Sequence, residues 1–363
     1  MTSLRQQIGQ MLILGFSGTV IDEQSPVANW LSNESLGGVL LFDYDLRTNQ
    51  PGKNLINQAQ IKNLTSQLKS HAQVSAFSRA EGLEPFIAID YEGGAVDRLK
   101  EIEGCFKTQK PSELSRLTDK DLQLELTKMA EMLQDLGFNL NFAPLVDLNL
   151  NEEQGIIGKL GRSFSAEPNQ VARAASIFVE VFAAHGLSCS YKHFPGHGSA
   201  VGDTHQGFVD TTETFQSKEL EPYSLLIPKS ELPVMIMTAH VINRQLDESG
   251  LPATLSHLML TGLLREELGF EGLIISDDLQ MQAISNHYTI DDALRLTINA
   301  GADMMIFANQ LGDISASELI DRIEALVQKN RIEKRRIEQA YRRIIELKRK
   351  QLNFVKQKSL ELN

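Results

Sequence analysis

Short, continuous runs of apolar residues recur along the 363-residue chain and are separated by longer amphipathic stretches. Runs in which hydrophobic residues follow one another without polar alternation are typical of parallel strands that are buried on both faces. We therefore predict eight strands, over Met11–Phe16, Gly38–Phe42, Phe86–Asp90, Asn139–Pro144, Ser188–Phe194, Val234–His240, Leu273–Asp277 and Met304–Asn309.

The segments between these runs carry apolar residues at helical spacing. We predict helices over Asp121–Leu136, Asn169–His185, Ser256–Leu268 and Asp291–Ala300, each followed by a glycine, which commonly ends a helix. Strands alternating with helices indicate an α/β fold, a (β/α)8 TIM barrel in a single domain over residues 1–363. An open doubly wound sheet is the alternative. Residues 314–352 have a long helical pattern rich in Lys and Arg, which predicts a helix that closes the barrel and exposes a basic face.

The composition narrows the range of partners. The formal charge of −12 argues against a nucleic-acid partner, because such proteins normally present a clustered basic face. It also argues against electrostatic docking on an anionic membrane. The first residues lack the long apolar run of a signal peptide, and no run approaches the roughly 20 apolar residues that span a bilayer. Two cysteines are too few for a disulfide framework, so we expect a cytoplasmic protein.

Polar residues collect directly after the apolar runs, where barrel enzymes place their chemistry. Such residues follow the third to seventh runs, at Asp90–Glu92, Asp147, Lys192–His193, His240 and Asp277–Asp278. So many polar strand ends indicate a rim that is built as a functional site.

The segment from Lys192 to His205 is the densest in chemical groups and contains three histidines and an aspartate. Its Gly and Pro residues predict a loop. Two chemical interpretations compete. In one, His193, His197, Asp203 and His205 bind a metal such as zinc. In the other, the Asp203 carboxylate orients His205, which then acts as a general acid and base.

Asp277 directly follows the seventh apolar run, so we expect its carboxylate at the barrel mouth. A carboxylate there can attack the anomeric carbon of a sugar and form a covalent glycosyl-enzyme. The alternative is a structural role as a helix N-cap or ion-pair partner, and the neighbouring Asp278 is the obvious second candidate for that role.

Several motifs, in this order, resemble the family 3 glycoside hydrolases, and within them the single-domain bacterial β-N-acetylhexosaminidases. The motifs are IGQMLILGF, GGVLLF, IDYEGGAVDRL, NFAPLVDLN, GRSF, KHFPGHGSAVGDTH, MTAHV and LGFEGLIISDDL, which together cover roughly residues 7–309. KHFPGHG followed by Asp-x-His is specific to the hexosaminidase branch. The resemblance favours the histidine acid/base over the metal, because the family looks independent of metal ions and other cofactors.

The resemblance also implies the roles of single residues. Asp277 matches the family's nucleophile, His205 its acid/base, and Asp203 the aspartate that orients the histidine. The positions that match sugar-binding residues are Asp90, Arg98, Arg162, Lys192 and His193. The implied activity is that of a monomeric, retaining, exo-acting β-N-acetylglucosaminidase of cell-wall recycling, with an N-acetylglucosamine-containing muropeptide or oligosaccharide as substrate. A β-N-acetylglucosaminide phosphorylase, a catalytically silent carbohydrate-binding barrel and a metal-dependent hydrolase are the alternatives.

The chain departs from the family's pattern at four positions and in one insert. The departures are Tyr91, Ala95, Asp97 and Gly161, and residues 149–159 form a stretch that is longer than usual. We expect these changes to lie around the outer part of the site and to affect the choice of aglycone rather than the reaction.

Overall fold

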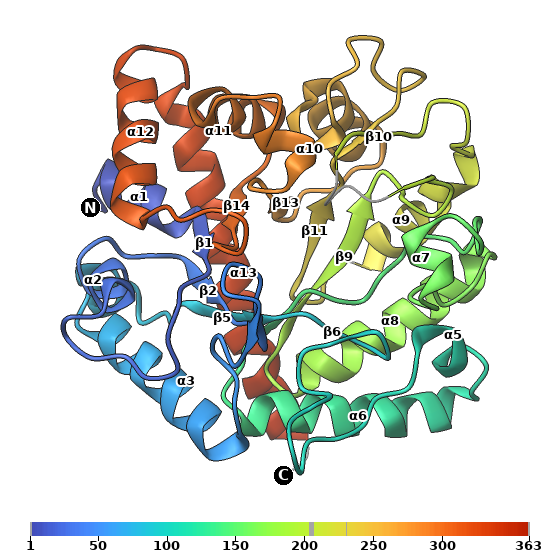
Figure 1. Ribbon diagram of the computed structural model, residues 1–363, viewed down its shortest axis with the longest axis horizontal. Coiled ribbons are helices and arrows are strands. Elements are labelled where there is room, and N and C mark those ends of the chain that lie inside the picture. The colour runs from blue at the N-terminus through green and yellow to red at the C-terminus, as the bar shows by residue number, and fades with distance from the viewer. Residues whose placement is uncertain (1, 203–206, 230, 362–363) are drawn as a thin grey trace.

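The protein forms a closed barrel of eight parallel strands surrounded by helices (Figure 1). This computed structural model describes residues 2–202, 207–229 and 231–361. The strands follow one another around the barrel in chain order, and the last pairs with the first. They are β1 (Leu12–Leu14), β2 (Gly38–Leu40), β5 (Phe86–Ile89), β8 (Leu140–Asn141), β9 (Ser188–Phe194), β11 (Val234–Thr238), β13 (Ile274–Asp278) and β14 (Met304–Phe307).

Each of the eight predicted strands is confirmed, and so is the TIM barrel; the open sheet is excluded by the pairing of β1 with β14. In register, Leu12 lies opposite Met305 and Leu14 opposite Phe307. Strand residues such as these are fully or almost fully buried and belong to one hydrophobic cluster that also includes the inner faces of the surrounding helices. Burial on both faces is why the strands read as continuous apolar runs.

The predicted helices are found with small shifts at their ends. The α-helices of seven or more residues that precede β11 are α1 (Leu4–Gln10), α2 (Pro26–Ser32), α3 (Gln58–Gln73), α6 (Asp119–Asp135) and α8 (Pro168–Ala184). Shorter ones are α4 (Ala76–Glu81), α5 (Pro111–Leu114), α7 (Ile156–Lys159), η1 (Ser217–Leu220), α9 (Glu221–Leu226), η2 (Ile227–Lys229) and η3 (Ala253–Leu255). They are followed by η4 (Leu258–Glu267), α10 (Gln282–Ser285) and α11 (Ile290–Ala300). The helix predicted over 256–268 is therefore η4, which has π-helical hydrogen bonding.

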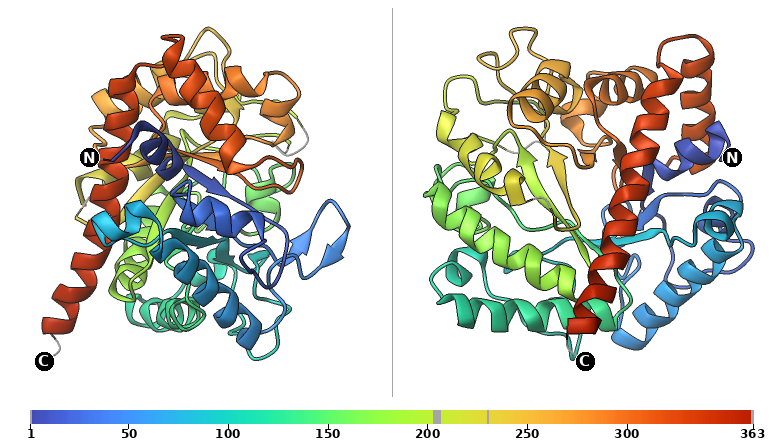
Figure 2. Two further views of the ribbon diagram at one scale, coloured as in Figure 1. Left: turned by 90° about the vertical axis from the view of Figure 1, so that its left-hand side faces the viewer. Right: turned by 180° about the vertical axis from the view of Figure 1, so that it is seen from behind.

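The C-terminal segment forms two helices rather than the one predicted over 314–352. They are α12 (Ala316–Gln328) and α13 (Lys334–Glu361), and Asn330 between them has a positive φ of 54°. A residue in the left-handed region ends an α-helix, which a periodic pattern alone does not reveal. Seen from behind, α13 runs across the barrel (Figure 2). Its Gln351 donates hydrogen bonds to carbonyls that precede β8 and β9, so α13 covers the N-terminal ends of these strands.

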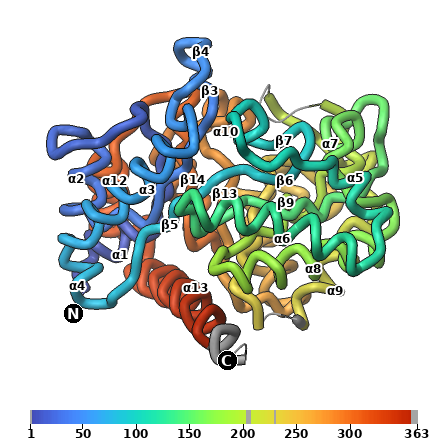
Figure 3. The backbone as a smooth tube through the Cα atoms, turned by 90° about the horizontal axis from the view of Figure 1, so that it is seen from below, coloured from blue at the N-terminus to red at the C-terminus, as the bar shows by residue number. Residues whose placement is uncertain are grey.

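The opposite end of the barrel carries short strand pairs that the apolar pattern did not predict. The antiparallel pairs are β3 (Tyr44–Asp45) with β4 (Gln50–Pro51), and β6 (Tyr91–Gly93) with β7 (Val96–Asp97). A parallel pair joins β10 (Val209–Asp210) to β12 (Val241–Ile242). The β3–β4 hairpin projects from this end, while the tip of α13 projects from the other (Figure 3). In the described residues we find no helix with the length and apolar character of a membrane span.

Candidate active site

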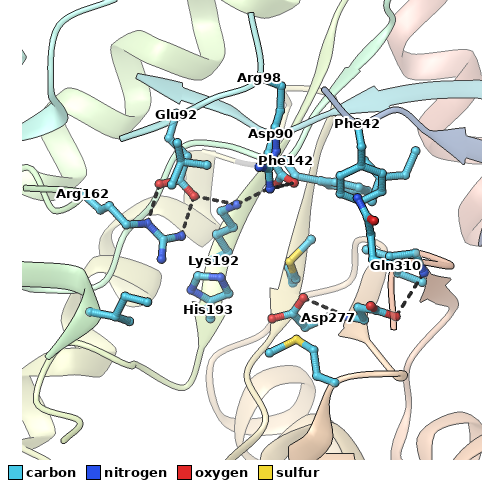
Figure 4. Close-up of a pocket in the computed structure, with 18 of the residues that line it drawn as sticks. Phe42, Asp90, Glu92, Arg98, Phe142, Arg162, Lys192, His193, Asp277 and Gln310 are labelled. Carbon is cyan, nitrogen blue, oxygen red and sulfur yellow. Dashed lines mark hydrogen bonds and ion pairs between the residues drawn. The ribbon is translucent and has the colours of Figure 1, made fainter. Parts of the chain in front are cut away.

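A cavity of about 280 Å³ opens at the C-terminal ends of the strands. Six of the residues predicted for the site line it, and they come from segments far apart in the chain (Figure 4): Asp90, Arg98, Arg162, Lys192, His193 and Asp277. The barrel therefore brings together the positions that the motifs indicated. Asp203 and His205, the proposed acid/base pair, lie outside the described residues.

Glu92 is the centre of a buried charge cluster on one wall of the cavity. Arg162 donates two hydrogen bonds to its carboxylate, at 2.9 and 2.7 Å, and Lys192 Nζ lies 2.8 Å from Glu92 Oε1. Burial by itself would raise the pKa of the Glu92 carboxyl, but the two cations outweigh it and hold that pKa well below its usual range. Glu92 is therefore ionised and fixes the positions of both cations.

Asp90 and Arg98 continue this network toward the solvent. Lys192 Nζ lies 3.3 Å from Asp90 Oδ1, and Arg98 Nη2 lies 3.7 Å from Asp90 Oδ2. The Arg98 guanidinium also stacks over the Phe42 ring, 5.5 Å from its centroid. Carboxylate oxygens and cationic N–H groups arranged in this way can bind adjacent hydroxyls of a sugar ring in pairs.

Asp147, whose side chain is completely buried, orients His193. Its Oδ2 lies 2.8 Å from His193 Nδ1, and its Oδ1 accepts the backbone N–H of His197 at 2.8 Å. A carboxylate only accepts, so His193 Nδ1 carries a proton and Nε2 is the nitrogen that can meet a ligand. Burial would raise the pKa of Asp147, but the hydrogen bond from His193 keeps it below its usual value. Burial also lowers the pKa of His197 to about 4, so this imidazole is neutral at neutral pH.

Asp277 and Asp278, adjacent at the end of β13, have different surroundings. Asp278 Oδ1 accepts the backbone N–H groups of Gln280 and Ala308, both at 3.1 Å, which makes it a structural residue of the turn. Its carbonyl accepts a hydrogen bond from Nε2 of the buried His240 at 2.9 Å. The Asp277 carboxylate lies in the cavity and accepts the N–H of Asp278 at 2.7 Å. The turn thus holds the Asp277 backbone while its carboxylate faces the site (Figure 4).

The start of the loop after β9 is firmly held. Glu219, 2% exposed, accepts hydrogen bonds from the backbone of Gly198 and Ser199 and from the Ser199 hydroxyl. Further along, Gly202 forms a parallel bridge with Gly155 of the 149–159 insert. Two anchors therefore precede the segment that contains Asp203.

Comparison with known proteins identifies the family. Residues 3–347 match the sequence profile described as Glycosyl hydrolase family 3 N terminal domain. The chain belongs to glycosyl hydrolase family 3. Its membership of this family assigns it to the glycosidases.

The family 3 relatives cover most of the chain. The chain is 33% identical to Beta-hexosaminidase A from Pseudoalteromonas piscicida, with 95% of this chain and 61% of that protein aligned. It is 30% identical to the Beta-hexosaminidase of Idiomarina loihiensis over 82% of this chain and 83% of that protein. The structure superposes on a family 3 β-N-acetylglucosaminidase from Paenibacillus sp. str. FPU-7 with a TM-score of 0.83, 28% identity and coverage of 96% of this chain and 63% of that one.

Of the four single-residue departures from the family 3 pattern, Tyr91 and Asp97 do not lie around the outer part of the site, so the expectation is wrong for these two; Ala95 and Gly161 adjoin the lining residues Val96 and Arg162. Tyr91 is completely buried and its hydroxyl donates to the Phe106 carbonyl, while Asp97 is buried and accepts a hydrogen bond from Thr108. Neither these two nor Ala95 and Gly161 line the cavity. Side chains alternate along an extended segment, so Tyr91 points away from the site that Asp90 and Glu92 face. The insert is different, because its Ile156 and Ile157 do line the cavity.

Sequence reasoning placed Glu92 and Asp147 at the rim but gave neither of them a role. The partners of Glu92 lie 70 and 100 residues further along the chain, and the distance in sequence hid the cluster. The available signal was the two-residue spacing of Asp90 and Glu92, which puts both on one face of an extended segment.

Proposed function

We propose that this family 3 protein is a retaining, exo-acting β-N-acetylglucosaminidase. The observation that carries the proposal is the pairing, in one cavity, of the Asp277 carboxylate with the charged network of Asp90, Lys192 and Arg162. The relatives named beta-hexosaminidase and β-N-acetylglucosaminidase support the choice of sugar. In this proposal Arg98 and His193 complete the set of groups that bind the terminal sugar.

The proposed reaction has two steps. Asp277 attacks the anomeric carbon and forms a glycosyl ester, while protonated His205 gives its proton to the departing oxygen. The leaving alcohol then exits, and neutral His205 takes a proton from water, whose oxygen attacks the same carbon and releases Asp277. Asp203 orients the imidazole and stabilises its charged form.

The natural substrate is proposed to be a muropeptide derived from peptidoglycan, with no metal or other cofactor. We further propose a cytoplasmic, monomeric enzyme made of one domain. The formal charge of −12 supports a small carbohydrate substrate over a polyanionic one, because a negative surface repels nucleic acid.

The proposal is tested with p-nitrophenyl N-acetyl-β-glucosaminide in phosphate-free buffer, with the β-glucoside as matched control. We expect release of p-nitrophenol from the N-acetyl sugar only, with the first sugar product in the β configuration by NMR. A neutral imidazole does not repel an incoming anion, so phosphate could replace water as the acceptor. Turnover that requires added phosphate would therefore identify a phosphorylase. Loss of turnover on chelation would favour the metal-dependent hydrolase, and sugar binding without turnover would identify a silent carbohydrate-binding barrel.

A further inference from the structure

The C-terminal segment concentrates positive charge in a protein whose formal charge is −12. Several of its Lys and Arg residues have partners; Arg349, for example, pairs with Glu81 at 2.7 Å. Arg331 and Arg335 differ, because their side chains are exposed and form no hydrogen bond or ion pair with any residue that the structure describes. The charge of these two guanidinium groups is therefore available to a ligand.

Arg331 and Arg335 line a second cavity, of about 410 Å³, at the junction of α12 and α13. Asn299, in the last turn of α11, and His257, just before η4, line it as well. The Asn299 amide donates to the Arg331 carbonyl at 3.0 Å and so holds the junction against α11, which lies beside α12 (Figure 1). None of these residues lines the active-site cavity, so this is a separate site.

Arg336 is the third arginine in the lining, and its side chain is held in place. Its Nε donates to the Ile298 carbonyl at 3.0 Å, and its Nη2 donates to Asp303 Oδ1 at 2.8 Å. Its Nη1 is buried and has no hydrogen-bond partner among the described residues. A buried donor without an acceptor is unfavourable, so this guanidinium is fixed in position with part of its donor capacity unused.

Arg336 also belongs to a cluster in which positive charge exceeds negative charge. The Asp303 carboxylate, which is completely buried, lies 2.7 Å from Arg265, 2.8 Å from Arg336 and 3.2 Å from Arg343. Burial lowers the pKa of Arg265 to about 10, and repulsion by Arg343 and Arg336 adds to this effect, against the attraction of Asp303. Three guanidinium groups around one carboxylate therefore leave a surplus of positive charge beside the cavity.

The carboxylates near the cavity do not cancel this surplus. Glu333 lines the cavity, and Asp292 acts on Arg331 at longer range while it pairs with Arg295 at 2.9 Å. The lining thus sets three arginines against one carboxylate. A concave site with this balance of charge favours an anionic ligand.

We propose that this second cavity binds a small phosphate ester, whose phosphate is held by Arg331, Arg335 and Arg336. A phosphate group has three terminal oxygens and can accept from three separate guanidinium groups, whereas a carboxylate offers two oxygens. The cavity is larger than the active-site cavity, at about 410 against 280 Å³, and leaves room for the rest of the ligand. Asn299 and Gln339 present amides that suit hydroxyls, so the favoured ligand is a phosphorylated sugar. The site does not depend on the proposed glycosidase reaction.

Isothermal titration calorimetry with glucose 6-phosphate tests the site, with glucose as the ligand control. We expect one molecule of the ester to bind per chain and glucose to give no signal. The R331Q/R335Q variant should weaken binding by about tenfold or more, because a hydrogen bond from a cation to the phosphate contributes a factor of that order. The matched control is R342Q/K356Q, which removes two exposed cations of α13 that do not line the cavity. Because salt screens distant charges, this control should change the Kd by less than about twofold.

Thermal unfolding checks that both double variants fold, and their Tm values should stay close to that of the wild type because the four side chains are exposed. If R331Q/R335Q binds glucose 6-phosphate as tightly as the wild type, the phosphate lies elsewhere and the site is overturned. Equal weakening in both double variants would mean diffuse attraction to a basic helix, which also overturns it. Binding of inorganic phosphate but not of the ester would overturn the ligand class, and no binding of either would overturn the whole proposal.

Discussion

Two adjacent aspartates at the end of β13 show how surroundings decide what a residue does. Both line the cavity, but the Asp278 carboxylate also holds the turn through the backbone N–H groups of Gln280 and Ala308. The two positions therefore respond differently to the same substitution.

Asp277→Asn is expected to lower kcat by a factor on the order of 10³ or more, because an amide cannot form the glycosyl ester. The free energy of unfolding should change less than in the Asp278 variant, because asparagine keeps the size of aspartate and an oxygen that can accept the N–H of Asp278. Asp278→Asn is expected to destabilise the protein instead, because the charged Oδ1 that accepts two backbone N–H groups becomes a neutral and weaker acceptor. Rates on the p-nitrophenyl substrate and urea unfolding curves measure both; equal losses of kcat in two stable variants would contradict the division of roles.

Glu92→Gln removes the charge between Arg162 and Lys192. The two cations would stay buried without their common partner, so we expect the free energy of unfolding to fall by about 3 kcal/mol, the usual cost of breaking a buried ion pair. KM should rise, because both cations lose the hydrogen bonds that position them for the sugar. Urea unfolding and steady-state rates measure the two effects. Glu131→Gln, on the exposed face of α6, is the control and should change neither.

The strands of the barrel could be predicted from sequence because burial on both faces requires a continuous run of apolar residues in each strand. The same reasoning could not find β3–β4 or β6–β7, since two-residue strands have no periodicity to detect. It missed the break at Asn330 because one left-handed residue leaves the apolar spacing of α12 and α13 intact. Sequence reasoning also placed Tyr91 at the site, because a motif gives the positions of residues along the chain but not the direction in which each side chain points.

The closure of the barrel between β1 and β14 depends on a glycine. A Cβ at Gly15 would overlap the carbonyl oxygen of Ala308, on the segment that follows β14. We expect Gly15→Ala to lower the free energy of unfolding by about 2 kcal/mol or more, as overpacking of a tight core does. Gly262→Ala in η4 is the matched control, since a Cβ there meets no atom within 4 Å and should be neutral or slightly stabilising. Thermal unfolding of both variants measures this, and equal Tm values would show that the seam can widen at no cost.

At the scale of the whole molecule, one end of the barrel serves the chemistry and the other holds a buried lysine. Lys348 of α13 is 3% exposed, and its ammonium donates to Gln10 Oε1 at 2.9 Å and to the Gly37 carbonyl at 3.1 Å. It also lies 4.8 Å from the centroid of the Phe86 ring. Burial lowers the pKa of Lys348 to about 7, against a smaller raising effect of Glu84. The helix that covers the strand ends is therefore held by a group that titrates near neutrality.

This shift gives the stability of the whole molecule a dependence on pH. The unfolded chain holds the proton of Lys348 up to about pH 10.4, whereas the folded protein releases it near pH 7, so the unfolded state binds more protons in between and stability rises with pH. Against Lys348→Met, which cannot titrate, the wild-type protein should gain about 2 kcal/mol in free energy of unfolding from pH 7 to pH 9. Urea unfolding at both pH values measures the difference. The control is Lys350→Met, at an exposed position two residues further along, which should keep the pH dependence of the wild-type protein. A difference between wild type and Lys348→Met that stays constant with pH would mean that the ammonium remains charged in the folded protein, held by Gln10, Gly37 and the aromatic ring.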